Sequence, residues 1–170
     1  SNVDEDVYLL GTLSAGNVVE LNVRLPFASS WNGMLSVVNA SGTPVTDTDG
    51  SLADGHFLGT IPADGAYYAK VLPVWNYNGH AYVLTDGSMT WANAEAYAQG
   101  LGGHLVTIND AAEQSWIQTT FGSTFGDLWI GLTDQALEGT WTWISGETAG
   151  YTSWASGQPS SGSSYNWARL

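Results

Sequence analysis

The spacing of hydrophobic residues changes once along this 170-residue chain, near residue 87. Before that point apolar and polar residues alternate, as at residues 19–25, which is the pattern of a half-buried strand. Further strands are predicted at residues 7–13, 34–39, 56–61 and 66–72. Turn dipeptides containing glycine separate these stretches. We therefore expect residues 1–77 to form an antiparallel β-sandwich.

After residue 87 the apolar residues follow helical spacing. One helix is predicted between the N-cap residue Thr90 and Gly102-Gly103, with an apolar face made of Trp91, Ala94, Ala98 and Leu101. A short strand is expected at residues 104–108. Asp110 and Glu113 have the spacing of a capping box, which predicts that a second helix begins there.

The charge of the chain limits its partners. Sixteen acidic residues face three basic ones, so the formal net charge is −13. Binding to nucleic acid requires clustered Lys and Arg, and we therefore exclude that function. No apolar run is long enough to cross a membrane, so membrane insertion is not expected either. The excess of carboxylates favours calcium, whose ligands are hard oxygens, although solubility in a salty medium explains it equally well.

Catalysis has little support in the sequence. The chain has no cysteine, and His56, His80 and His104 are too scattered for a metal triad. No histidine has a serine partner at a recognisable spacing. Asp134 and Glu138 are the residue types of a glycosidase acid pair, but two carboxylates on one short loop are better explained by a cation between them. We predict that the protein is not an enzyme.

An ordered series of motifs fills the second half of the chain. It comprises Tyr82-Val83-Leu84, Thr90-Trp91, Gly102-Gly103-His104-Leu105-Val106-Thr107-Ile108, Trp129-Ile130-Gly131-Leu132, Glu138-Gly139-Thr140-Trp141-Thr142-Trp143 and Gly157-Gln158-Pro159. This succession resembles the C-type lectin-like domain. The resemblance implies two helices and a small antiparallel sheet over residues 78–170, and an α+β fold for the chain. The family's later Trp-Asn-Asp segment would lie beyond Leu170, so we expect a domain that is C-terminally incomplete.

The first half resembles a different family. Asp4-Glu5-Asp6-Val7-Tyr8 and Ala63-Asp64-Gly65-Ala66-Tyr67-Tyr68 are similar to motifs of a secreted bacterial β-sandwich, the pre-peptidase C-terminal type. The resemblance implies that residues 1–77 form a domain that accompanies exported proteins.

The lectin resemblance also implies site residues. The family's sugar-binding motif falls at Gln158-Pro159-Ser160, and its downstream ligand falls near Asn166, so the implied carbohydrate-binding residues are Gln158, Ser160 and Asn166. Gln158 matches galactose-type members. Ser160 departs from the family, because a hydroxyl replaces a carboxylate or an amide and is a poorer calcium ligand.

A second, accessory calcium position is implied by Asp134 and Glu138, which have the family spacing after the Trp-Ile-Gly-Leu strand. Two carboxylates so close repel each other unless a cation neutralises them. Glu113 lies where some family members place a further calcium ligand, although its capping role already explains it. The metal residues predicted here are therefore Asp134, Glu138 and Glu113, with calcium as the cofactor.

These observations predict a non-catalytic binding module from a secreted or cell-surface bacterial protein with a role in adhesion, in which this chain is part of a larger polypeptide. Its expected ligand is a glycan, recognised with or without calcium, or an extracellular protein. The alternative is a protein-binding or structural spacer module that has lost sugar binding, because the function of a domain is not fixed by its fold.

Overall fold

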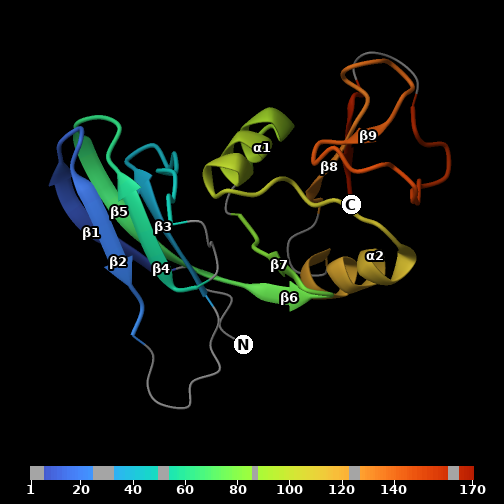
Figure 1. The fold of residues 1–170 in the computed structure, drawn as a ribbon. Helices are drawn as coiled ribbons and strands as arrows, with labels where there is room; N and C mark the ends of the chain where they lie inside the picture. The colour runs from blue at the N-terminus through green and yellow to red at the C-terminus, as the bar shows by residue number, and fades with distance from the viewer. Residues whose placement is uncertain (1–5, 25–32, 50–53, 86–87, 123–126, 161–164) are drawn as a thin grey trace. The chain divides into compact units, whose positions relative to one another are not determined.

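The computed structural model describes residues 6–24, 33–49, 54–85, 88–122, 127–160 and 165–170 (Figure 1). The chain divides into two compact units. The first unit comprises Ser1–Asp86 and Ala96–Gly103, and the second comprises Gly87–Glu95 and His104–Leu170. The division therefore falls inside the first helix, α1, which spans Trp91–Gly100.

The first unit is built from antiparallel strands (Figure 1). Three of them form one sheet in the order β1-β5-β3, namely β1 (Asp6–Leu13), β5 (Gly65–Pro73) and β3 (Gly33–Asn39). Two more form a second sheet, β2 (Val18–Asn22) and β4 (His56–Thr60). A short hairpin follows, made of β6 (Trp75–Tyr77) and β7 (His80–Tyr82).

Apolar side chains from both sheets share one core cluster. Val37 from β3 and Phe57 from β4 are fully or almost fully buried in it, at 0% and 1% exposure. Partly buried side chains of β1 and β2, including Leu13 and Leu21, pack against the same cluster. The apolar side chains of the two sheets therefore pack against each other. The assignment of this unit to a β-sandwich family stays a prediction.

Helix α1 begins and ends where the sequence indicates. The Asn93 N–H donates a 3.3 Å hydrogen bond to the Thr90 hydroxyl, which is an N-cap contact. At the other end the Gly103 N–H donates to the Ala98 carbonyl, and Gly102 has a φ of +83°, a conformation that favours glycine. Leu101, just beyond the helix, packs with Met34 and Leu72 of the first unit.

The second helix, α2 (Ala111–Ile117), continues as a π-helical turn over Gln118–Gly122, labelled η1. The Glu113 N–H donates to Asp110 Oδ1 at 2.8 Å, as the capping-box spacing predicts. Across the described parts of the chain, no helix is both long and apolar enough to span a membrane.

The second unit contains a three-stranded antiparallel sheet in the order β10-β8-β9. Its strands are β8 (Trp129–Thr133), β9 (Thr142–Trp143) and β10 (Trp167–Arg169). Gly131 in β8 lies so close to residues 105 and 106 that a Cβ atom would come within 2.7 Å of the Leu105 carbonyl oxygen. Only glycine fits there, which explains its place in the Trp-Ile-Gly-Leu motif.

The prediction of a strand at residues 104–108 is wrong. This segment forms no ladder, and its backbone contact with β8 is one hydrogen bond, from the Gly131 N–H to the Val106 carbonyl. The Leu105 N–H donates instead to the side chain of Glu95. The wider prediction of an α+β fold with two helices and small antiparallel sheets is confirmed.

Candidate functional site

Asp134 directly follows β8 and begins the turn that leaves this strand. Its backbone N–H donates to the Asn166 carbonyl at 3.2 Å, and the same carbonyl accepts from the Thr133 hydroxyl at 2.7 Å. Asp134 is 4% exposed, which is rare for a carboxylate. Its Oδ2 atom accepts from the Gly139 N–H at 2.9 Å and thereby closes the turn.

The other carboxylate oxygen of Asp134 and the side-chain oxygen of Asn166 share an unusual property. Asp134 Oδ1 and Asn166 Oδ1 are both buried, and neither has a hydrogen-bond partner among the described residues. The two residues are opposite each other in the β8–β10 pairing, so their side chains lie on one face of the sheet. Buried oxygens without partners are costly, and a cation satisfies such oxygens well.

Glu138 follows Asp134 in the same turn. Hydrogen bonds from the Leu137 N–H to the Asp134 carbonyl and from the Thr140 N–H to the Leu137 carbonyl hold the turn. Glu138 is exposed, whereas Asp134 is buried. The predicted pair is therefore on one turn, but its members have different environments.

The side chain of Glu113 makes its contact at the start of α2, not beside Asp134. Its carboxylate accepts a 2.8 Å hydrogen bond from the Asn109 N–H, and the side chain is 7% exposed. No three acidic or histidine side chains come close enough to hold a metal ion anywhere in the described ranges. The structure therefore does not bring Glu113 together with Asp134 and Glu138, and helix capping accounts for its spacing from Asp110.

The predicted sugar-binding turn has a local structure of its own. Ser160 donates from its N–H and its hydroxyl to Gln158 Oε1, at 2.9 and 3.0 Å, and the Gln158–Pro159 peptide bond is cis. Gln158 is exposed. Within the described parts of the chain no hydrogen bond joins this turn to Asn166, which is held against Asp134 instead. Gln158 and Ser160 therefore share one turn, whereas Asn166 lies apart from it, directly before β10.

Sequence reasoning missed the role of Glu95, a helix residue that is only 5% exposed. Its carboxylate accepts from His104 Nδ1 at 2.6 Å and from the Leu105 N–H at 2.9 Å. These bonds position the segment that passes beside Gly131. The sequence offers little signal for this contact, because a glutamate inside an alanine-rich helix usually faces solvent.

A perturbed histidine lies in the first unit. His56 Nδ1 makes a short contact with Asp49 Oδ2, and His56 Nε2 lies 3.3 Å from Glu20 Oε1. The hydrogen bond to Asp49 raises the pKa of His56 above its ordinary value of 6.5, the bond to Glu20 raises it further, and desolvation opposes both. The ring therefore joins β4 to Glu20 of β2 and to Asp49.

Comparison with known proteins gives a consistent result for the second half of the chain. The Lectin C-type domain family model matches residues 87–168. The chain is 40% identical over 97 residues to the alpha-N-acetylgalactosamine-specific lectin of Patiria pectinifera, a match that covers 51% of this chain and 57% of that protein.

Two further relatives give similar values. The galactose-specific lectin nattectin of Thalassophryne nattereri is 36% identical over 89 residues, which cover 50% of this chain and 56% of nattectin. Lithostathine-1 of Mus musculus is 34% identical over 89 residues, which cover 50% of this chain and 54% of that protein.

The chain spans a little over half the length of these three relatives. All three are eukaryotic, and the predicted bacterial origin remains a prediction. The pre-peptidase C-terminal assignment of residues 1–77 also remains a prediction, because the family model covers residues 87–168. The family model and the lectin relatives together support a C-type lectin domain at residues 87–168.

Proposed function

We propose that the second unit is a non-catalytic carbohydrate-binding module for sugars of the galactose and N-acetylgalactosamine class. The observation that carries the proposal is the similarity of residues 87–168 to lectins named for these sugars. The exposed Gln158 side chain supports it, because its amide nitrogen can donate to a sugar hydroxyl while its Oε1 atom accepts from Ser160. We expect the protein to act outside the cell, as a secreted or surface protein.

Calcium is the cofactor that this proposal includes. The buried oxygens Asp134 Oδ1 and Asn166 Oδ1 fit a hard cation, and Glu138 adds a second carboxylate on the same turn. When bound, the ion would supply positive charge between two oxygens that have no hydrogen-bond partner among the described residues. We therefore assign Asn166 to the cation position with Asp134, whereas Gln158 and Ser160 remain the proposed sugar contacts.

Asp134 and Ser160 have separate roles in the proposed site. Asp134 fixes the turn through Gly139, so the cation position and the end of β8 are held together. Ser160 holds the Gln158 side chain against its own backbone, which limits the rotamers that must be ordered when a sugar binds. This restraint favours a small, preorganised contact over a flexible loop.

A glycan array tests the proposal. The 170-residue chain is applied once with calcium and once with a chelator. We expect binding to terminal galactose or N-acetylgalactosamine, and loss of that binding in chelator. Gln158→Ala should abolish binding, whereas Gln118→Ala, which truncates an exposed glutamine at the end of α2, should leave it intact.

If the array shows no glycan binding while circular dichroism shows that the chain is folded, the sugar assignment is refuted. The protein-binding or spacer alternative would then be favoured. Binding that survives chelation would keep the sugar assignment and remove calcium from it.

A further inference from the structure

The ring of His56 lies between carboxylates from two segments of the first unit. His56 is the first residue of β4, and Glu20 lies opposite Leu58 in the β2–β4 register, which makes Glu20 the diagonal neighbour of His56 on one face of the sheet. The Nε2 atom of the ring is 3.3 Å from Glu20 Oε1. The Nδ1 atom makes a shorter contact with Asp49 Oδ2. Both ring nitrogens therefore face a carboxylate oxygen.

Asp49 reaches the ring from the side of β4 that faces away from β2. The Thr48 N–H and the Thr48 hydroxyl both donate to the Leu58 carbonyl at 2.8 Å, and the Leu58 N–H donates to Asp47 Oδ1 at 3.1 Å. The backbone groups of Leu58 thus serve residues 47–49, whereas the neighbouring residues of β4 pair with β2. The imidazole ring therefore connects β2 to residues 47–49 across β4.

The two contacts together require a ring that is protonated on both nitrogens. An ionised carboxylate only accepts hydrogen bonds, so each ring nitrogen must donate to its own partner. A neutral imidazole has one N–H, and its other nitrogen then faces a carboxylate with no proton between them. The hydrogen bonds to Asp49 and Glu20 raise the pKa of His56, in agreement with this geometry.

The surroundings of the two carboxylates determine which contact a neutral ring keeps. The side chain of Asp49 is 14% exposed, and that of Glu20 is 64% exposed. Water competes less for the shorter and more buried contact, so Nδ1 should keep its proton and Nε2 should lose it. The expected neutral form is the Nδ1–H tautomer, and the contact that is lost is the one with β2.

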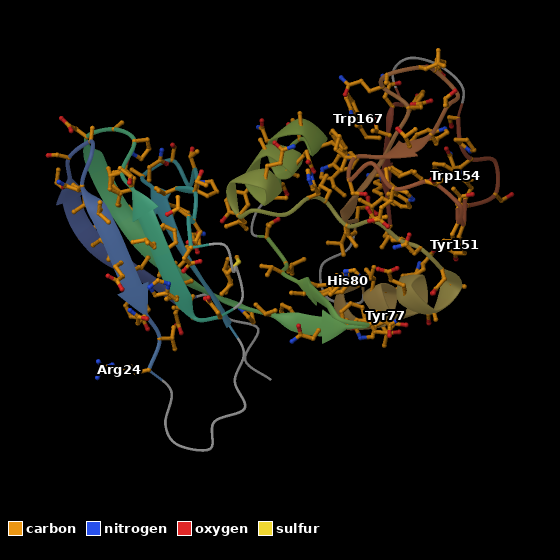
Figure 2. All side chains as sticks on the ribbon, in the orientation of Figure 1. Arg24, Tyr77, His80, Tyr151, Trp154 and Trp167 are labelled. Atoms are coloured by element: carbon orange, nitrogen blue, oxygen red, sulfur yellow. The ribbon has the colours of Figure 1, made fainter. Side chains whose placement is uncertain are left out.

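Other charged groups nearby do not change this order. Asp54 accepts from the His56 backbone N–H at 2.8 Å, and Asp47 lies on the segment beside β4. Both of these carboxylates favour the protonated ring. Arg24, just beyond β2, is exposed, and its side chain points away from the strands (Figure 2). Within the described residues, the charged groups that contact the ring itself are the carboxylates of Glu20 and Asp49.

We propose that His56 is a proton-controlled contact for strand β2. While the ring is protonated, it holds β2 through Glu20 and residues 47–49 through Asp49. As the pH rises, Nε2 releases its proton to water, the contact with Glu20 ends and the contact with Asp49 remains. Strand β2 then opens locally more often, whereas residues 47–49 stay held. This inference concerns the first unit and is independent of the carbohydrate proposal.

NMR of the 170-residue chain labelled with ¹⁵N at histidine tests the tautomer. The ring ¹⁵N shifts distinguish the protonated ring from each neutral tautomer, and the signals missing from His56→Gln identify His56. Between about pH 5 and 9 we expect one titration, from the protonated ring to the Nδ1–H form. An Nε2–H neutral form would overturn the proposal, and so would a ring that is neutral throughout.

Two isosteric variants separate the two contacts. In Glu20→Gln the carboxamide accepts from a protonated Nε2 and donates to a neutral one, so the contact with β2 should persist at every pH. In Asp49→Asn the charged partner is Glu20, so the neutral ring should change to the Nε2–H tautomer. If the neutral ring of Asp49→Asn is the same tautomer as in the wild type, Asp49 does not select it and the proposal fails.

Hydrogen exchange measures the consequence for β2. The Val23 N–H donates to the Gly55 carbonyl at 2.7 Å directly after β2, and the Thr48 N–H reports on residues 47–49. Amides at such exposed edges exchange through local opening. As the pH rises through the titration of His56, the protection factor of Val23 should fall about two- to five-fold, the value of one exposed ion pair, and that of Thr48 should stay constant.

The same measurement on Glu20→Gln provides the matched control. Both protection factors should be independent of pH in this variant, because the contact with β2 survives deprotonation. A constant protection factor at Val23 in the wild type would overturn the proposal. An equal fall at Val23 and Thr48 would also overturn it, because the ring would then release both segments together. A fall at Val23 that is unchanged in Glu20→Gln would show that the contact with β2 does not cause it.

Discussion

The ring of His56 bridges two carboxylates that come from different segments of the first unit. Because the folded pKa is raised, the protonated ring stabilises the fold. This contribution is fully present below the unfolded value of 6.5 and is lost as the pH rises through the folded pKa. The histidine thus makes the stability of the first unit fall as the pH rises above 6.5.

We predict that His56→Gln lowers the melting temperature most at pH values below 6.5, and that its difference from the wild type shrinks as the pH rises through the folded pKa. Thermal unfolding across a pH series measures the difference. The pKa of His56, followed by NMR, should fall in Asp49→Asn. A His56 pKa at or below its ordinary value in the wild-type chain would contradict the assignment.

Secondary-structure elements were largely predictable, because local signals determine them. The strands at 7–13, 34–39, 56–61 and 66–72 and both helix starts agree with the structure to within one or two residues. The prediction failed at residues 104–108, where a long-range contact decides the outcome. Glu95 takes the Leu105 N–H that a ladder would have used, and helical sequence alone cannot show which glutamate becomes buried.

The candidate site was predictable only in part, for the same reason. The spacing of Asp134 and Glu138 is local and could be read from the sequence. The pairing of Asn166 with Asp134 depends on the β8–β10 register, which the sequence does not reveal. The unpartnered oxygens become visible only once that register is known.

At the start of α2 we predict that Asp110→Ala costs about 1 kcal/mol of stability, because the N–H of Glu113 loses its acceptor. Urea denaturation measures the change. Glu113→Gln is the matched control. The amide oxygen can still accept from Asn109, so its cost should be well below that of Asp110→Ala. Equal losses in both variants would show that the cap is not the important contact.

The acidic residues of the chain far outnumber the basic ones. Three basic residues oppose sixteen acidic ones, and the three histidines add three positive charges at most. Self-repulsion of this kind opposes the compact state and is weakened by salt. The Debye length falls from about 10 Å at 0.1 M salt to about 3 Å at 1 M.

We therefore predict that the melting temperature rises by roughly a few degrees between 0.1 and 1 M sodium chloride. Differential scanning calorimetry provides the measurement, with chelator present throughout so that trace calcium does not contribute. A melting temperature that stays constant or falls would mean that the acidic side chains are already neutralised within the fold.

The division between the two units inside α1 has an evolutionary consequence. Tyr97 and Leu101 pack with Met34 and Leu72, although they belong to the range that matches the lectin family. A recombination event that transferred residues 87–168 to a new host would leave these side chains without their partners. The start of α1 is therefore a poor crossover point, and lineages that shuffle this module should carry the preceding strands along with it.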